Sequence, residues 1–202
     1  MFDIVFFFMP SLVEAKTADE WNNEGVDLVQ SGKYDEAIKA FDEALKINPQ
    51  DAEAWYYKGV ALSDLGRDEE VLEAFDKALE IDPKYSNAWN YKGIILGDLG
   101  RYEEALEAFD KALEINPEDP FSLGCKGLAL HGLGRYEEAF EAWIDEGIAF
   151  SNLGRWEEAN ECFEKANKLD PSLKVPSTPA FETVFVITGL LAVAYLIKRR
   201  KR

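Results

Sequence analysis

The side chains that most often carry catalysis are scarce in this sequence. His131 is the only histidine, and the two cysteines, Cys125 and Cys162, do not form a CxxC pair. GxSxG, HExxH and phosphate-loop motifs are also missing, so the usual arrangements for nucleophilic, zinc-dependent or phosphate-binding chemistry are not available. We therefore predict that the chain is not an enzyme, with no catalytic residue, no metal site and no cofactor.

Carboxylates are the remaining groups with acid–base or calcium-binding potential. They form short runs, such as Glu103 with Glu104 and Glu137 with Glu138, at the start of expected helices. A carboxylate in that place opposes the positive end of the helix macrodipole, which accounts for the runs without a site. The two cysteines lie in segments of apolar helical periodicity, where a free cysteine behaves as a small hydrophobe; a disulfide is the alternative.

The charge of the chain limits its partners. Its 202 residues include 22 basic and 39 acidic side chains, and five of the cations form the tail 198–202. The rest of the chain therefore carries a net charge of −22. Such a body repels nucleic-acid phosphates, because binding to them depends on Lys and Arg. We expect no nucleic-acid partner.

The elements that position these side chains follow from a repeat of 34 residues. Four residue types recur at this interval: Gly25, Gly59, Gly93 and Gly127; Trp21, Trp55 and Trp89; Phe41, Phe75 and Phe109; Pro49, Pro83 and Pro117. Each unit holds two stretches of helical periodicity joined by Leu-Gly-Arg, where Gly66 or Gly100 supplies the positive φ of a helix end. The residue before each proline leaves the α region, so each unit is predicted to be a helical hairpin.

The pattern resembles the tetratricopeptide-repeat signature, a Trp, a Gly four residues on, an Ala twelve after that, then Phe, Ala and Pro. Three copies match, over residues 18–51, 52–85 and 86–119, with Asp68 and Val71 as departures in the second. The resemblance implies an all-α fold, a superhelical solenoid of helical hairpins over residues 16–171.

The last unit, residues 120–171, departs from the pattern. Its Leu-Gly-Arg-aromatic motif returns 20 residues after the previous one, and no Asn-Pro or Asp-Pro turn intervenes. Aligning Trp143 and Gly147 with a fifth repeat leaves 14 residues missing, which is about 3.9 helical turns, so the apolar stripe stays in phase. We predict one fused helix at about 135–152, followed by a capping helix at 155–169.

The resemblance also implies where a partner binds. Stacked tetratricopeptide hairpins place their first helices on the concave side, where residues that face neither partner helix form a groove. The predicted groove residues are Asn22, Val26, Gln30, Tyr56, Val60, Asp64, Asn90, Ile94, Asp98, Leu128 and His131. This mixture of amides, aliphatics and an aromatic suits an extended peptide or a partner helix, with Asn22 and Asn90 bonding its backbone; solvated helix faces are the alternative.

Chaperone-binding members of the family use these helices to clamp a C-terminal carboxylate. The places of that clamp hold other residues here: Asn22, Val26, Asn87 and Tyr91. A clamp of that kind is therefore not expected.

The N-terminal segment 1–15 resembles a secretory signal peptide. It has an apolar stretch followed by Val13-Glu14-Ala15, a small-x-small pattern of the kind that signal peptidase cuts. The positive n-region is missing, because Asp3 is the only early charge, so the true start is expected upstream of Met1. The alternative is an apolar helix packed on the solenoid.

The C-terminal segment predicts a membrane anchor. Residues 181–197 are almost wholly apolar, follow a loop-like linker at 172–180 and precede the basic tail 198–202. Their 17 residues are the lower limit for a transmembrane helix. Because a basic flank stays in the cytoplasm, the repeats are expected on the extracytoplasmic side.

These last residues resemble the PGF-CTERM sorting tail of archaeal surface proteins, a Pro-x-Phe tripeptide followed by a short apolar helix and a basic cluster. The tripeptide is Pro179, Ala180 and Phe181, with Ala180 in place of the family's glycine. The resemblance implies cleavage by an archaeosortase and attachment of a lipid; the uncut helix is the alternative anchor.

Together these features predict a membrane-anchored protein–protein interaction scaffold that binds a peptide or helix of a partner protein outside the cytoplasm. An assembly factor or chaperone-like adaptor for envelope complexes is one alternative. A tail-anchored adaptor that faces the cytoplasm is another.

Overall fold

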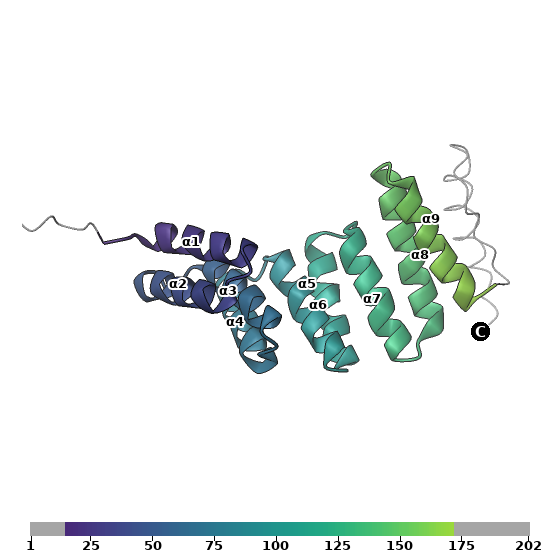
Figure 1. The fold of residues 1–202 in the computed structure, drawn as a ribbon. Coiled ribbons are helices and arrows are strands. Elements are labelled where there is room, and N and C mark those ends of the chain that lie inside the picture. Colours follow the sequence, from purple (N-terminus) through teal and green to yellow (C-terminus); the bar gives the residue numbers. More distant parts are fainter. Residues whose placement is uncertain (1–14, 172–202) are drawn as a thin grey trace, which may run out of the picture.

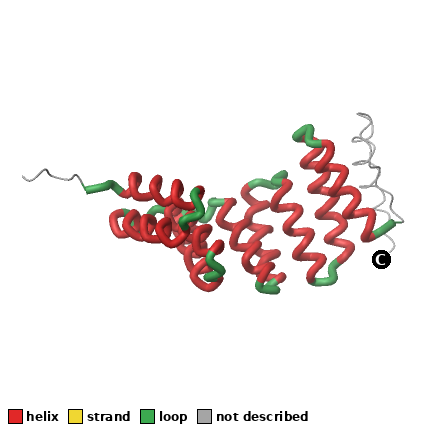
Figure 2. Tube along the Cα trace, in the orientation of Figure 1, coloured by secondary structure: helices red, strands yellow, loops and turns green. Residues whose placement is uncertain are grey.

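The computed structural model describes residues 15–171, which form an elongated stack of antiparallel helices without a strand (Figures 1 and 2). The helices of this part are α1 (Ala18–Gln30), α2 (Tyr34–Ile47), α3 (Ala52–Asp64), α4 (Asp68–Ile81), α5 (Ser86–Asp98), α6 (Tyr102–Ile115), α7 (Pro120–Gly132), α8 (Tyr136–Asn152) and α9 (Trp156–Leu169). The predicted all-α solenoid is confirmed.

The predicted segments at the two ends fall outside this description. Residues 1–14 contain almost all of the signal-like segment, and residues 172–202 contain the linker, the apolar span and the basic tail. Between residues 15 and 171, no helix combines the length and the apolar character that crossing a bilayer requires.

Short polar signals set the ends of the helices. Thr17 and Glu20 form a reciprocal capping box at the start of α1, and Asp51 accepts hydrogen bonds from the first backbone N–H groups of α3. The turn after each first helix contains a glycine with positive φ, 68° at Gly66 and 73° at Gly100, as the Leu-Gly-Arg motif predicts. These signals fix the hairpin length that the packing needs.

Inside each hairpin, a glycine of the first helix lies against an aromatic ring of the second. A Cβ added at Gly59 would lie 2.7 Å from Phe75 Cε1, and one at Gly93 would lie 2.7 Å from Phe109 Cε1. Phe75 has no exposed surface. The glycine therefore leaves the space that the ring fills, which fixes how closely the two helices pack.

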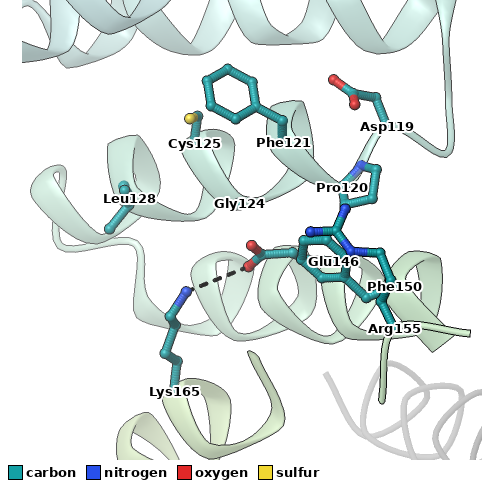
Figure 3. Close-up of a pocket in the computed structure, with 10 residues that line it drawn as sticks. All are labelled: Asp119, Pro120, Phe121, Gly124, Cys125, Leu128, Glu146, Phe150, Arg155 and Lys165. Atoms are coloured by element: carbon teal, nitrogen blue, oxygen red, sulfur yellow. Dashed lines mark ion pairs between the residues drawn. The ribbon is translucent and has the colours of Figure 1, made fainter. Parts of the chain in front are cut away.

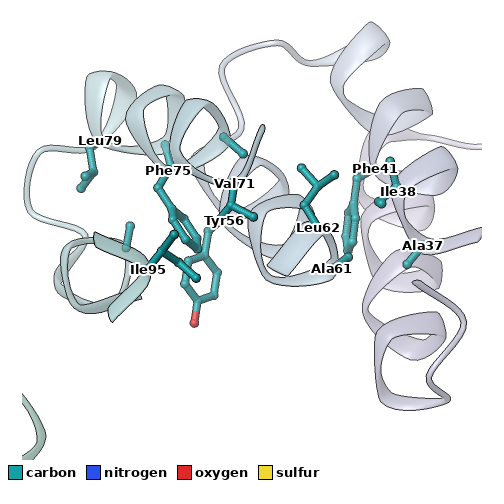
Figure 4. Packing of buried hydrophobic residues seen from close by; sticks show 13 residues of the cluster. Ala37, Ile38, Phe41, Tyr56, Ala61, Leu62, Val71, Phe75, Leu79 and Ile95 are labelled. Atoms are coloured by element: carbon teal, nitrogen blue, oxygen red, sulfur yellow. The ribbon is translucent and has the colours of Figure 1, made fainter. Parts of the chain in front are cut away.

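The hairpins are joined by apolar clusters between neighbouring helices and by repeated ion pairs. Figure 4 shows one cluster that runs from Phe41 of α2 through Leu62 of α3 to Ile95 of α5. At the surface of these junctions, Lys58 pairs with Asp42, Lys92 with Asp76 and Lys126 with Asp110, at 2.7, 2.5 and 2.6 Å. Each lysine belongs to a first helix and each aspartate to the second helix before it.

Helix α8 is one continuous helix of 17 residues over the range expected for the fused helix. It packs against both α7 and α9. A Cβ at Gly127 of α7 would lie 2.4 Å from Trp143 Nε1, and one at Gly147 would lie 2.4 Å from Phe163 Cε1 of α9. The first part of α8 is thus the second helix of one hairpin, and its last part is the first helix of the next.

Trp143 shows the consequence of this fusion. In the regular hairpins, the indole Nε1–H of Trp55 donates to the Pro49 carbonyl oxygen at 3.1 Å, and that of Trp89 donates to the Pro83 oxygen at 3.0 Å. No proline turn precedes Trp143, and its buried Nε1 has no hydrogen-bond partner among the described residues. The fused helix therefore costs this hydrogen bond.

Candidate functional site

The first helices form the inner side of the solenoid. Helices α1, α3, α5 and α7 contact one another in succession, whereas the second helices of neighbouring hairpins make few or no such contacts. The layer whose members lie closer together follows the shorter, concave path. We call the solvent-facing side of α1, α3, α5, α7 and the last part of α8 the inner face.

Most of the predicted groove residues are accessible. Asn22, Val26, Val60 and Ile94 are half-buried, and the Asn22 Oδ1 is itself buried without a hydrogen-bond partner among the described residues. Gln30, Asp64, Asp98, Leu128 and His131 are exposed, and the imidazole of His131 lies 5.2 Å from the ring centre of Tyr136. Alternating carboxylate and aliphatic groups therefore continue from one hairpin to the next, which suits an elongated ligand rather than a compact one.

Two of the predicted groove residues, Tyr56 and Asn90, are instead buried, with 7% and 4% of their surface exposed. The ring of Tyr56 lies 4.9 Å from that of Tyr85 and 5.7 Å from that of Tyr91, between centroids. Burial raises the pKa of Tyr56 well above its usual value. The expectation that these two side chains face a partner is therefore corrected.

Asn90 ties α5 to the start of α7. Its Nδ2–H donates to Asp119 Oδ2 at 3.2 Å, and its Oδ1 accepts from Ser122 Oγ–H at 2.7 Å. Asp119 also accepts from the backbone N–H of Ser122 at 3.1 Å as the N-cap of α7. All three groups are used within the protein, so Asn90 is a structural link between hairpins.

The physical reason for both corrections is the repeat position that Tyr56 and Asn90 share with Asn22 and Gly124, at intervals of 34 residues. At this position the side chain meets the next first helix: Tyr56 meets Tyr91, and Asn90 meets Ser122. Gly124 has no side chain, and a Cβ there would lie 2.4 Å from Glu146 Oε1. The space that a side chain fills in the other repeats is thus occupied by the carboxyl group of Glu146.

A pocket of about 320 Å³ lies beside this carboxyl group, between α7, α8 and the start and middle of α9 (Figure 3). Its apolar wall includes Phe121 and Leu128, which are 49% and 61% exposed. Its polar groups are Asp119, Glu146, Arg155 and Lys165. The pocket opens where the inner face of α7 meets that of α8.

Glu146 is the buried charge of the pocket. The residue is 7% exposed, and its Oε2 has no hydrogen-bond partner among the described residues. Lys165 Nζ forms a long ion pair with Oε2 at 4.0 Å. Burial raises the pKa of Glu146, while Lys165 and the Cys162 thiol oppose that rise.

The two cysteines are free thiols in this structure. Burial is the main cause that raises the pKa of Cys125 to about 11 and that of Cys162 to about 12. Among residues 15–171, no group of three or more His, Cys, Asp or Glu side chains is arranged to hold a metal ion.

Of the pocket residues, only Leu128 was among the predicted groove residues. The signal for Glu146 was in the sequence: the residue before the hairpin glycine is Lys58, Lys92 and Lys126 in the three middle units but a glutamate, Glu24 or Glu146, in the first and the last. This reversal of charge stands out only when Gly147 is aligned with the other glycines.

Models of one known family match almost the whole solenoid. Four tetratricopeptide-repeat models match residues 22–86, 86–119, 108–141 and 140–173, so together they cover residues 22–173. A model of the PGF-CTERM motif matches residues 178–200. No curated protein sequence matches the chain.

Solved structures share the fold. MamA from Desulfovibrio magneticus RS-1 (residues 41 to its end) has a TM-score of 0.61 and 24% identity over 78% of this chain and 97% of its own. YrrB, a TPR protein with an unusual peptide-binding site, has 0.57 and 22% over 77% and 87%. The first TPR of Spaghetti (RPAP3), bound to the HSP90 peptide SRMEEVD, has 0.57 and 20% over 58% and 93%.

Proposed function

Because the chain belongs to the tetratricopeptide-repeat family and ends in a PGF-CTERM-type segment, we propose that it is a membrane-anchored, non-catalytic scaffold whose inner face binds a peptide or helix of a partner protein outside the cytoplasm. One observation carries this proposal: successive first helices leave accessible apolar and polar side chains along one continuous face. A ligand that runs along the stack contacts several hairpins at once.

Similar structures support the choice of ligand. YrrB has a peptide-binding site, and the RPAP3 domain was solved with a bound peptide. In this chain, the half-buried aliphatic side chains of Val60 and Ile94 supply apolar contacts. The exposed carboxylates of Asp64 and Asp98 stand one helical turn further on and select against acidic ligands.

Photo-crosslinking tests this face without disturbing the fold. A photoreactive amino acid is placed at Asp64 or Asp98 on the inner face and, as matched controls, at the exposed Glu73 or Glu107 on second helices. We expect a discrete adduct with a partner protein from the inner positions only. Adducts of equal yield from both sets, or from the controls alone, would contradict the proposal.

The anchor and its side are the second part of the proposal. The PGF-CTERM match supports a surface protein held by its C-terminus, and the apolar span followed by five basic residues supports retention of that tail on the cytoplasmic side before any processing. Cleavage near the tripeptide Pro179-Ala180-Phe181 and addition of a lipid would replace the helix as the anchor.

Protease treatment of intact cells tests the side. If the repeats lie outside, added protease degrades the segment that carries α1–α9 while a cytoplasmic control protein stays intact. An epitope after Lys16 should then be lost from intact cells. Protection of that epitope until the cells are lysed would instead favour the adaptor that faces the cytoplasm.

A further inference from the structure

Glu146, like Glu24 of the first unit, stands where the three middle units have a lysine, but only Glu146 is buried. In three units the residue before the hairpin glycine is a lysine, which pairs with an aspartate of the preceding second helix, as Lys92 pairs with Asp76. In α8 no separate second helix precedes Gly147, because one helix performs both roles. The aspartate partner is therefore missing at this position, and a carboxylate occupies the place of the ammonium group.

This carboxylate is enclosed by residues of α7 and α9. Gly124 of α7 provides the room for Oε1, because a Cβ there would lie 2.4 Å from it. On the other side, the Cys162 thiol of α9 faces the carboxyl group and lowers its pKa. Oε2 is left without a hydrogen-bond donor although the residue is only 7% exposed. A buried acceptor of this kind gains most from a charged donor.

The cations already in the pocket leave Oε2 unsatisfied. The Arg155 side chain donates to Glu158 Oε1 from Nε and Nη2 at 2.9 and 2.6 Å, and its guanidinium lies 4.6 Å from the ring centre of Phe150. Lys165 Nζ is 4.0 Å from Oε2, beyond hydrogen-bond distance, and its side chain is 48% exposed. Lys165 can therefore move into solvent when another donor arrives.

The walls of the pocket fit a long aliphatic stem. Phe121 and Leu128 line it and are largely exposed, and Figure 3 shows both on α7, beside the helix that carries Glu146. A volume of about 320 Å³ is at the small end for ligand sites and holds one long side chain rather than a cofactor. An anionic ligand is disfavoured, because it would face the carboxylates of Glu146 and Asp119.

We propose that this pocket receives a lysine or arginine side chain of the partner segment that binds the inner face, with its charged group donating to Glu146 Oε2 and its methylene stem packing on Phe121 and Leu128. This inference rests on the proposed function and adds one anchor residue to the ligand. It places that anchor at the C-terminal end of the solenoid.

We expect protons to compete with a bound cation for the Glu146 carboxylate, because of the groups that surround it. Lys165 and the Cys162 thiol face it from α9, and Cys125 and Asp119 line the α7 side. Burial raises the pKa of Glu146, so the carboxyl group takes up a proton at a higher pH than an exposed glutamate does. The protonated group no longer attracts a cation, and binding weakens as pH falls through this raised pKa.

The test uses the full chain in detergent micelles and a fluorescent, end-capped peptide Gly-Leu-Lys-Leu-Gly, with versions that carry Gln or norleucine in place of Lys. Fluorescence anisotropy gives the three dissociation constants. We expect the Lys peptide to bind at least about tenfold more tightly than the Gln peptide, because one charge-assisted hydrogen bond to a buried acceptor is worth that factor. Equal affinities would overturn the inference.

Two variants assign the effect to the pocket. Glu146→Gln should abolish the preference for Lys over Gln, whereas Glu107→Gln, an exposed charge loss on α6, should leave it unchanged. A preference that persists in Glu146→Gln overturns the inference. Phe121→Ala changes an exposed wall residue, so it should fold, and it should weaken the Lys and norleucine peptides by the same factor.

Two further results identify the occupant of the pocket and separate the pocket from the proposed function. If a chain lacking 198–202 binds the Lys peptide tenfold more tightly than the full chain, the protein's own basic tail occupies the pocket, and the assignment to a partner is overturned. If crosslinking from Asp64 persists but no preference for Lys is found, the pocket assignment fails and the proposed function stands. If a preference for Lys is found without crosslinks from Asp64, the pocket assignment stands and the proposed function fails.

Discussion

At the scale of single residues, the contact between a glycine and an aromatic ring sixteen positions later is the unit of packing in this protein. It occurs in the regular hairpins, as between Gly93 and Phe109, and twice in the irregular end, where Gly127 meets Trp143 and Gly147 meets Phe163. The spacing could be read from the sequence because glycines and aromatics recur together. The contact distance could not, because it depends on how two helices lie in space.

Helix α5 offers a matched test of this contact. A Cβ at Gly93 would lie 2.7 Å from Phe109 Cε1, whereas one at Gly97 would meet nothing within 4 Å. Gly93→Ala should lower the free energy of unfolding by about 1–3 kcal/mol, because the ring must shift. Gly97→Ala should raise it by up to about 1 kcal/mol, since alanine favours helix. Denaturant unfolding measures both, and equal effects would contradict the packing described.

The thiol of Cys125 should react slowly with alkylating reagents. Burial raises its pKa to about 11, from an ordinary 9.0, and only the thiolate reacts. In a Cys162→Ala variant at pH 8, we expect alkylation by iodoacetamide about 100-fold slower than in the unfolded chain, as measured by mass spectrometry. The rate should rise about tenfold per pH unit between 8 and 10; a plateau near pH 9 would show an ordinary thiol.

Tyr56 and Asn90 show why the site could not be predicted completely from the sequence. The repeat frame places both on first helices, as predicted, yet each side chain is used to join its hairpin to the next one. Whether a first-helix position faces solvent or the neighbouring hairpin depends on the angle between hairpins. That angle is a property of the packed stack and not of the 34-residue pattern.

At the scale of elements, two kinds of ion pair have different roles. Arg101 donates to Glu104 from Nε and Nη2, both at 2.6 Å, within the first turn of α6, and Arg67, Arg135 and Arg155 repeat this arrangement on their own helices. The lysine–aspartate pairs instead cross from one hairpin to the next. The acidic runs are thus explained by the helix dipole together with these arginines, and only the second kind of pair connects neighbouring hairpins.

A double-mutant cycle separates these roles. Replacing Lys92 by Met and Asp76 by Asn, singly and together, should give a coupling of about 0.5 kcal/mol, because the lysine side chain is only 22% exposed but the aspartate is 52% exposed. The same cycle on Arg101 and Glu104 should give a smaller coupling, since the arginine side chain is 45% exposed and the glutamate 53% exposed. Both couplings should fall in 1 M salt; a larger value for the arginine pair would contradict this order.

Helix α8 packs against two different helices, so its residues must face both of them in the correct helical phase. Its two hairpins depend on the four-residue spacing from Trp143 to Gly147, because Trp143 packs on α7 and Gly147 packs on α9. One alanine inserted after Asp145 turns the last part of α8 by about 100° relative to the first. We expect hydrogen exchange protection to be lost in Trp156–Leu169 and kept in α3–α6.

The control for this insertion is an alanine added after Gly154, in the turn between α8 and α9, where no helix changes phase. That variant should keep most of its protection in α9. Equal loss in both variants would mean that α9 is held by its connection rather than by the register of α8.

At the scale of the whole molecule, regular repetition explains why the fold was predictable. Each hairpin carries its own turn signals and its own glycine–aromatic contact, so the architecture follows from one unit copied along the chain. The pocket at Glu146 was not predictable in this way, because it arises where the copy fails and one helix replaces two. Departures from the repeat are therefore where a site specific to this protein is expected.

The distribution of charge along the whole chain predicts how the protein meets a membrane. The tail 198–202 holds five cations, and the remainder carries a net charge of −22. A fragment of residues 16–171 should therefore be repelled by vesicles of anionic lipid and stay in the supernatant on sedimentation. The full chain should sediment with both neutral and anionic vesicles, because its apolar segment, rather than its charge, provides the attachment.

Two outcomes would contradict this division of the molecule. Sedimentation of the 16–171 fragment with neutral vesicles would mean that the solenoid itself has a lipid-binding surface. Membrane lipid and the protein ligand would then compete for the inner face. Release of the full chain from anionic vesicles by 1 M salt would mean that the basic tail, and not the apolar segment, makes the attachment, because salt screens charge but strengthens apolar burial. Resistance to salt together with loss of sedimentation on deleting 181–197 is the result that the proposed anchor requires.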